Sequence, residues 1–172
     1  MPRNVEVKAR VGDFEALRRR AESMSDVPVE IIDQRDTFFV VSRGRLKLRV
    51  LAPDASELIA YERPDDTGAK LSEYSIIRSS EPETFLAVLS SALEVRGVVA
   101  KRRFLYRVGR TRVHLDDVEG LGTFIELEVV LEEGQTCDEG TAIAERVMRE
   151  LGIENADRVA GAYIDLLEKS RR

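Results

Sequence analysis

Alternation of charged and apolar residues along short segments constrains the fold of this chain more than any other feature. Residues 43–50 read RGRLKLRV, so that basic residues occupy positions 43, 45, 47 and 49. Residues 3–10 read RNVEVKAR, in which polar residues at 4, 6, 8 and 10 alternate with apolar ones. Because successive side chains of a β-strand point to opposite faces, each segment predicts a strand with one charged face and one apolar face.

Similar patterns recur along the chain and are interrupted by helical periodicity. Further strands are expected at 36–41, 45–51, 57–63, 72–79, 98–108, 111–117 and 123–132. Helices are expected at 13–23, from 80 to near Gly97, at 138–152 and at 156–170. The connections are mostly short, which is typical of antiparallel neighbours.

The charged faces and the amphipathic helices must be accommodated together. For any single strand, a charged face turned to water is the simplest explanation. A sheet that turned every charged face to water would, however, leave four amphipathic helices with little apolar surface to cover. A sheet closed on itself, with its apolar side outward and wrapped by the helices, satisfies both demands. We therefore predict an α+β protein forming a single domain over residues 1–172, with the charged faces lining a lumen.

Composition excludes several classes of protein. The 172 residues carry 27 basic and 32 acidic side chains and a net charge of −5, whereas nucleic-acid-binding modules are usually basic overall. One cysteine and one histidine make a disulfide framework or a zinc site improbable. No stretch approaches the ~18 apolar residues of a membrane span. We expect a cytoplasmic protein without nucleic-acid or membrane partners.

The charged residues fall into two sets that suggest a ligand. Convergent Arg and Lys side chains suit a polyanion such as a polyphosphate. Clustered carboxylates suit a hard divalent cation such as Mg²⁺ or Mn²⁺. Cross-strand salt bridges in water explain the same pattern equally well. The basic set is Lys8, Arg10, Arg45, Lys47, Arg49, Arg63, Lys101 and Arg103, and the acidic set is Glu6, Asp116, Glu126 and Glu128.

These segments resemble the motifs of the CYTH family, whose founding members are class IV adenylate cyclases and thiamine triphosphatases. NVEVK at 4–8 is similar to the ExExK signature of that family. The closing AYIDLLEK at 162–169 is similar to the C-terminal helix of cyclase-like members, and the resemblance covers nearly the full length. The other similar segments are DTFF at 36–39, GRLKLR at 44–49, YERP at 61–64, KRRFLY at 101–106 and HLDDVEGLGTFIELE at 114–128.

The resemblance implies a triphosphate tunnel, an eight-stranded antiparallel closed barrel with a charged lumen and helices packed outside. It implies that a nucleoside or other triphosphate binds the basic residues that match the family motifs, which are Lys8, Lys47, Arg49, Arg63, Lys101 and Arg103, and that the acidic set binds Mg²⁺ or Mn²⁺. We expect Arg10 and Arg45, which share the charged strand faces, to bind the same substrate. Lys70 is a weaker candidate for the basic set, and relatives of the cyclase type suggest a homodimer. The resemblance assigns catalytic roles to Lys8, Arg103 and Glu126.

Three functions follow from the resemblance. The first is a class IV adenylate cyclase that converts ATP to cyclic AMP and pyrophosphate. The second is a triphosphatase acting on thiamine triphosphate, inorganic tripolyphosphate or a nucleotide. The third is a non-catalytic polyphosphate or nucleotide sensor, which is suggested by Asn4 in place of the first Glu of the signature. His114 is interpreted as a hydrogen-bonding or conformational residue in preference to a general base.

Overall fold

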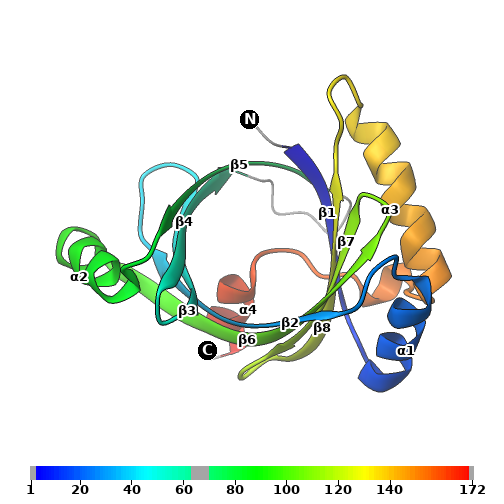
Figure 1. The fold of residues 1–172 in the computed structure, drawn as a ribbon, viewed down its shortest axis with the longest axis horizontal. Coiled ribbons are helices and arrows are strands. Elements are labelled where there is room, and N and C mark those ends of the chain that lie inside the picture. The colour runs from blue at the N-terminus through cyan, green and yellow to red at the C-terminus, as the bar shows by residue number, and fades with distance from the viewer. Residues whose placement is uncertain (1–2, 63–69, 171–172) are drawn as a thin grey trace.

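Eight antiparallel strands close into a barrel in the computed structural model, which describes residues 3–62 and 70–170 (Figure 1). Around the barrel the strands follow the order β1-β5-β4-β3-β2-β6-β7-β8, and β8 pairs with β1 to complete the closure. This confirms the predicted closed antiparallel barrel. The strands are β1 (Arg3–Arg10), β2 (Glu30–Phe39), β3 (Arg45–Ala52), β4 (Ala55–Glu62), β5 (Lys70–Ser79), β6 (Val95–Val108), β7 (Thr111–Val118) and β8 (Gly122–Val130).

Four α-helices lie around this barrel. Helices α1 (Phe14–Met24) and α3 (Cys137–Leu151) lie side by side outside β1, β6, β7 and β8. Helix α2 (Pro82–Ala92) projects beside the opposite wall, and α4 (Tyr163–Ser170) is seen through the barrel opening in Figure 1. A short 3₁₀ turn, Asn155–Asp157, precedes α4. In the described part of the chain, no helix is long and apolar enough to cross a membrane.

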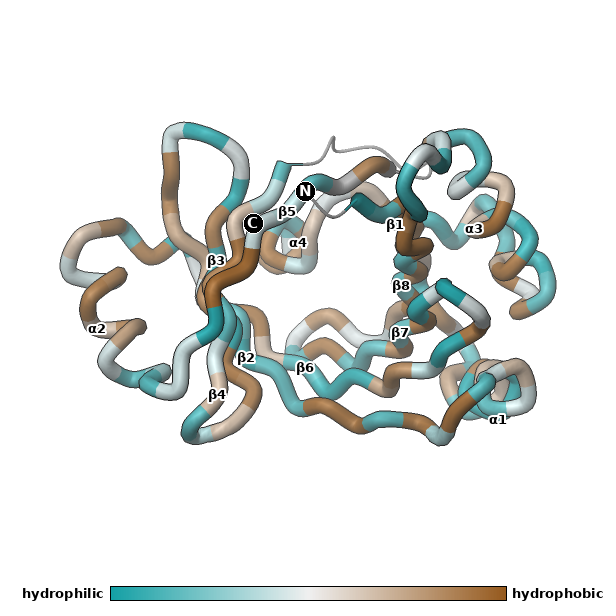
Figure 2. The backbone as a smooth tube through the Cα atoms, turned by 45° about the horizontal axis from the view of Figure 1, so that its top comes forward, coloured by the Kyte–Doolittle hydropathy of each residue, from teal (hydrophilic) through white to brown (hydrophobic). Residues whose placement is uncertain are grey.

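The apolar outer face of the strands forms the main core, as the alternation predicts. Val5 and Val7 of β1 are 0% and 1% exposed, and they pack with Leu127 of β8 and Met148 of α3 in one cluster. Teal and brown alternate along the strands in Figure 2, which is the pattern of a wall with one polar and one apolar face. Because the helices cover the apolar side, the polar side of each strand is left to the interior of the barrel.

Local sequence signals position α3 against this wall. Thr136 and Glu139 form a reciprocal capping box at its start, and Gly152 ends it in the left-handed conformation with φ +75°. Gly140 faces the barrel, where an added Cβ would lie 2.5 Å from the Leu131 side chain and 2.8 Å from Val5. The absence of a side chain at Gly140 therefore allows the helix to approach the strands closely.

The helix expected at 156–170 is wrong in its first half. The α-helix begins only at Tyr163, because the residues before it are held in other conformations. Arg158 bridges to Ala9 of β1, the backbone N–H of Val159 donates to the carbonyl of Lys8, and Gly161 has φ +83°. The Asp165 side chain then accepts from the backbone N–H of Ala162 at 2.7 Å and fixes the start of the helix.

Candidate active site in the barrel lumen

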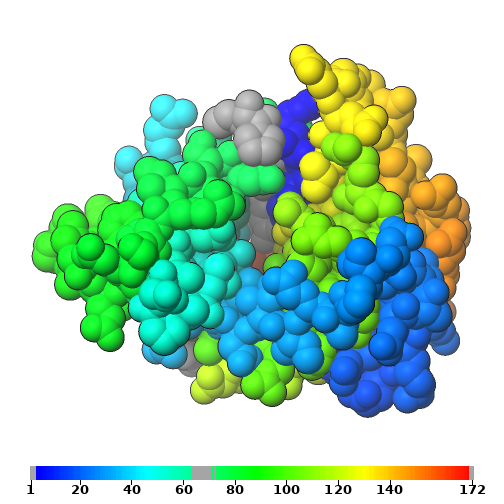
Figure 3. Space-filling model, viewed as in Figure 1, coloured from blue at the N-terminus to red at the C-terminus, as the bar shows by residue number. Residues whose placement is uncertain are grey.

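The barrel encloses a cavity of about 890 Å³ whose wall combines both signs of charge. A hollow is visible at the centre of the face shown in Figure 3. Among the described residues, eight basic and six acidic side chains line it, whereas acidic residues outnumber basic ones in the whole chain. The lining therefore has a local positive excess and a volume typical of small-molecule sites. The basic residues are Lys8, Lys47, Arg49, Arg78, Lys101, Arg103, Arg107 and Arg112, and the acidic ones are Glu6, Glu30, Asp36, Glu57, Glu126 and Glu128.

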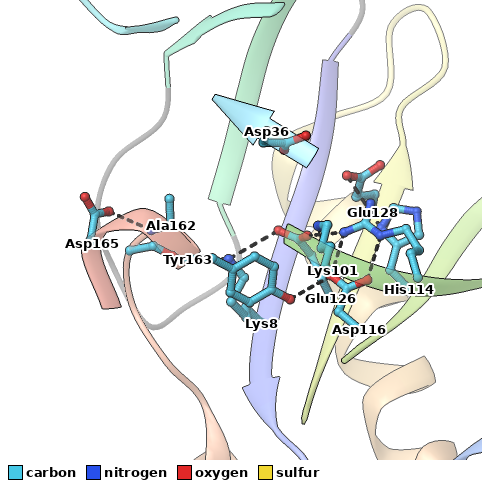
Figure 4. Close-up of polar contacts among 12 residues, drawn as sticks. Lys8, Asp36, Lys101, His114, Asp116, Glu126, Glu128, Ala162, Tyr163 and Asp165 are labelled. Atoms are coloured by element: carbon cyan, nitrogen blue, oxygen red, sulfur yellow. Dashed lines mark hydrogen bonds and ion pairs between the residues drawn. The ribbon is translucent and has the colours of Figure 1, made fainter. Parts of the chain in front are cut away.

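Asp116 of β7 anchors the cations on one side of the lumen (Figure 4). Arg103 Nε and Nη2 donate to its two carboxylate oxygens at 2.7 Å each, in a bidentate fork. Lys101 Nζ donates to Asp116 Oδ2 at 3.1 Å, and the Tyr163 hydroxyl donates to the same oxygen at 2.8 Å. Asp116 is fully buried, so this network holds both cations in fixed positions at the wall.

The network continues from Arg103 to Glu126 and Lys8. Arg103 Nη2 also donates to Glu126 Oε2 at 3.0 Å, and Lys8 Nζ lies 3.6 Å from Glu126 Oε1. Lys8 also donates to the carbonyl of Gly161 at 3.3 Å and lies 3.9 Å from the centre of the Tyr163 ring. The segment leading into α4 thus supplies a carbonyl and an aromatic face to a lysine on β1 (Figure 4).

Asp36, on another strand of the lumen wall, also binds one arginine and one lysine. Asp36 of β2 accepts from Arg49 Nε and Nη2 at 2.9 Å each and from Lys47 Nζ at 3.0 Å. The two cations lie two residues apart on β3, which pairs with β2 in a register that places Arg49 opposite Asp36. A guanidinium carries five N–H donors, and this fork uses only two of them.

The enclosed charges shift several pKa values. Burial alone would raise the pKa of the Asp116 carboxyl, but Arg103 and Lys101 outweigh burial and hold that pKa well below its usual range. Burial and the neighbouring Arg103 lower the pKa of Lys101 to about 7. Burial, again with Arg103 nearby, lowers the pKa of His114 to about 3, so its imidazole is neutral near pH 7. The lumen therefore stabilises ionised carboxylates, whereas Lys101 is only partly protonated near pH 7.

Four buried polar atoms in this lining have no hydrogen-bond partner among the described residues. They are Asn4 Oδ1, Gln34 Oε1, Arg112 Nε and His114 Nδ1. Buried polar atoms are nearly always satisfied, and an exception in a cavity indicates a missing water or ligand. His114, Glu126 and Glu128 also offer one ligand atom each within 4.8 Å of one another. Carboxylate, amide and imidazole ligands of this kind fit a divalent metal ion.

Comparison with known proteins agrees with this geometry. The model of the CYTH domain matches residues 2–163. The chain belongs to the CYTH family. Adenylate cyclase CyaB of Aeromonas hydrophila is 23% identical over 174 residues, which cover 96% of this chain and 89% of that protein.

Solved structures share this CYTH fold. The PH1012 protein of Pyrococcus horikoshii OT3 has a TM-score of 0.85 and 28% identity, covering 95% of this chain and 99% of that one. HpAC1 of Hippeastrum, described by a dominant triphosphatase activity, has a TM-score of 0.71 and 16% identity, covering 97% and 96% of the two chains. The family and the fold are thus shown, whereas the relatives bear two different activities.

Most residues expected for the CYTH site line the cavity, but several do not. Glu6, Lys8, Lys47, Arg49, Lys101, Arg103, Glu126 and Glu128 are all in the lining. Arg10 is exposed at the end of β1, with its guanidinium 4.9 Å from the Phe124 ring, and it is absent from the lining. Arg45 instead pairs with Asp165 of α4 at 2.9 Å. Arg63 lies outside the described residues, as does the side chain of Lys70.

Asp116 occupies a different position from that expected for a metal ligand. It is 0% exposed and lies behind the lining, where both of its oxygens accept from Arg103 and one also accepts from Lys101 and Tyr163. A metal ion would have to displace some of these donors. The metal role of Asp116 stays a prediction, and its contacts are those of a residue that orients cations.

The lumen also contains residues to which the motif comparison assigned no role. Gln34 and Asp36 lie on the inward face of β2, which begins at Glu30 and not at residue 36 as expected. Arg112 of β7 lines the cavity and binds Glu128 at 2.8 Å. Strand alternation could have indicated Gln34 and Asp36. Both lie at even-numbered positions of 30–38, so they share one strand face with Glu30 and Phe38.

Proposed function

We propose that this protein is a metal-dependent enzyme that binds a triphosphate in the barrel lumen and acts most like a class IV adenylate cyclase. The observation that carries the proposal is a lumen lined by eight cations, six of them buried or half-buried, with carboxylates set among them. A triphosphate brings several negative charges, and a cavity with a positive excess lowers the free energy of enclosing them. The similarity to adenylate cyclase CyaB supports ATP as the substrate.

The cation–carboxylate pairs explain how the lumen receives phosphate. Asp36 and Asp116 hold Arg49 and Arg103 in forks that use two guanidinium donors each. In the described contacts Arg49 keeps three further N–H groups for phosphate oxygens, and Arg103, which also donates to Glu126, keeps two. The substrate can therefore join the pairs without breaking them. The donors are therefore oriented before the substrate enters, which reduces the reorganisation required in the transition state.

In the cyclase reaction, the ribose 3′-hydroxyl gives up its proton to solvent and its oxygen forms a bond to the α-phosphorus. The bond from that phosphorus to the bridging oxygen of pyrophosphate breaks, and pyrophosphate leaves. Lys8 and Arg103 are placed to offset the negative charge that develops on the leaving pyrophosphate. Glu126 contacts both cations and fixes their separation. Glu6, Glu126 and Glu128 supply carboxylates that would hold Mg²⁺ or Mn²⁺, which neutralises phosphate charge when bound.

A triphosphatase is the second candidate, and it uses the same lumen. The triphosphatase activity of HpAC1 supports it. In that reaction water attacks the terminal phosphorus of a nucleotide, thiamine triphosphate or inorganic tripolyphosphate. The two candidates differ in which nucleophile is positioned beside the triphosphate, and not in the cations that hold it.

The test is to incubate the purified protein with Mg²⁺ or Mn²⁺ and each substrate, and to resolve the products. Cyclic AMP with pyrophosphate supports the cyclase, and orthophosphate supports the triphosphatase. Binding without turnover leaves only a triphosphate sensor. The variant Arg103→Met should lose most binding, whereas Arg102→Met, on the same strand but exposed and paired with Asp33, should not. Equal binding by both variants would refute the lumen as the site.

A further inference from the structure

The imidazole of His114 lies beside two carboxylates that the proposed function gives to the metal ion. We propose that His114 is a nitrogen ligand of that ion, together with Glu126 and Glu128, and that the site therefore prefers Mn²⁺ to Mg²⁺. The inference rests on the proposed metal dependence of the protein. It adds a nitrogen ligand to the carboxylates, and it predicts a preference for Mn²⁺ over Mg²⁺ that carboxylates alone would not give.

Strand pairing brings the three side chains together. In the β7–β8 register His114 lies directly opposite Glu126, and Glu128 follows two residues later on the same face of β8. The three ligand atoms all lie within 4.8 Å of one another, and His114 Nδ1 is 3.8 Å from Glu128 Oε1. Ligand bonds of about 2.1 Å place opposite ligands about 4.2 Å apart, so small side-chain movements close this set around one ion.

The contacts of Glu128 direct one of its oxygens toward the histidine. Arg112 holds Glu128 Oε2 at 2.8 Å, and Oε1 of the same carboxylate is the atom that faces His114. Arg103 holds Glu126 Oε2 at 3.0 Å, and Lys8 Nζ lies 3.6 Å from Glu126 Oε1. These cations orient both carboxylates, as groups around metal ligands commonly do. Figure 4 shows His114 and Glu128 side by side at the edge of this network.

One ring nitrogen of His114 lacks a hydrogen-bond partner among the residues that the structure describes. The residue is 4% exposed, yet Nδ1 has no hydrogen-bond partner in the described part of the chain. The distance of 3.8 Å to Glu128 exceeds that of a hydrogen bond. A buried imidazole nitrogen that faces a carboxylate oxygen at 3.8 Å is suitably placed for both atoms to bind one metal ion between them.

An imidazole ligand changes which metal the site selects. Mg²⁺ strongly prefers oxygen ligands and near-ideal octahedral geometry, whereas first-row transition metals accept imidazole nitrogen. Mn²⁺ accepts both carboxylate and nitrogen ligands. A site with one nitrogen and two carboxylates is therefore expected to bind Mn²⁺ more tightly than Mg²⁺.

The chain contains one histidine, which makes the test unusually direct. Tag-free protein is loaded with Mn²⁺, alone and with inorganic tripolyphosphate, and nitrogen bound to the ion is detected by electron spin-echo envelope modulation. A histidine-type nitrogen modulation is expected in the wild type, altered by ¹⁵N-histidine labelling and absent in His114→Gln. Titration should show that His114→Gln weakens Mn²⁺ binding about tenfold or more and Mg²⁺ binding much less.

Two controls keep the outcomes separate. His114→Gln is required to retain the wild-type circular dichroism spectrum, and Glu133→Gln, exposed outside the lumen, should leave Mn²⁺ affinity unchanged. Mn²⁺ binding without nitrogen modulation would overturn the histidine ligand while leaving the proposed metal dependence intact. Absence of Mn²⁺ binding under both conditions would overturn the ligand and the metal dependence together.

Discussion

Binding of a triphosphate should be accompanied by proton uptake at Lys101. The free protein holds the pKa of this lysine at about 7, because burial and Arg103 disfavour its charged form. A triphosphate in the lumen adds negative charge within reach of Lys101 Nζ and reverses that preference. Above pH 7 the free lysine is mostly neutral and the bound lysine is charged, so each binding event removes a proton from solution.

The magnitude follows from the two protonation states. With a pKa of about 7, Lys101 carries its proton in about 10% of free molecules at pH 8. If the bound phosphates restore its ordinary pKa of 10.5, almost every bound molecule carries the proton, and uptake is about 0.9 proton. The apparent Kd should then rise by up to about tenfold per pH unit from about pH 7 toward pH 10.

Isothermal titration calorimetry measures this uptake directly. ATP is titrated into metal-free protein at pH 8 in buffers of different ionisation enthalpy, and the slope of observed enthalpy against buffer enthalpy gives the protons taken up. A phosphate monoester has a second pKa of about 6, so the terminal phosphate of ATP is expected to be ionised at pH 8 and to take up no proton on binding. Lys101→Met should lose most of the slope. Lys169→Met, which alters an exposed lysine of α4, should retain it.

A buffer-independent enthalpy in the wild type, with ATP bound, would refute the reasoning. It would mean that Asp116 already keeps Lys101 charged at pH 8 in the free protein. If the dependence of the enthalpy on the buffer persists in Lys101→Met, another group takes up the proton. Lys47 is the candidate, since burial and Arg49 also lower its pKa.

Three further predictions concern stability, each measured as the free energy of unfolding in urea. Asp116→Asn leaves buried cations without their carboxylate and should destabilise the fold by about 3–5 kcal/mol. Tyr163→Phe removes a 2.8 Å hydrogen bond to the same carboxylate and should cost about 1.5–3 kcal/mol. Gly140→Ala places a methyl group 2.5 Å from Leu131 and should cost about 1–3 kcal/mol, whereas Gly12→Ala enters open space and should cost far less.

The wall of the lumen could be predicted because strand parity determines which side chains share a face. Lys47 and Arg49 face the cavity together, as do Lys101 and Arg103, once the sheet is closed with its apolar side outward. No tertiary information beyond the alternation was needed for this assignment. The alternation also indicated eight strands, and the eight-stranded antiparallel barrel that the family motifs implied is confirmed by the structure.

Position along the barrel axis could not be predicted in the same way. Arg10 and Arg45 have the parity of lumen residues, but each lies near a strand end and contacts Phe124 or Asp165 instead. Depth depends on the stagger between strands, which the alternation within one strand does not specify. The start of α4 was missed for a related reason, because the cap at Asp165 and the positive φ of Gly161 interrupt a helical periodicity that continues through them.

The pairing of charges was the least predictable feature, and it divides the carboxylates into two kinds. Asp36 on β2 and Asp116 on β7 each bind one arginine by a fork and one lysine, so their charge is spent on orienting cations. Glu128 on β8 binds only one guanidinium through Oε2 in the described contacts and turns Oε1 toward His114. The sequence places all these acids on inward faces, yet only the strand register decides which of them meet basic residues. Glu126 lies between the two kinds, because it contacts Arg103 and Lys8 and also lies beside His114 and Glu128. We therefore expect a polyphosphate to bind the cations that Asp36 and Asp116 orient, and a metal ion to bind beside Glu128.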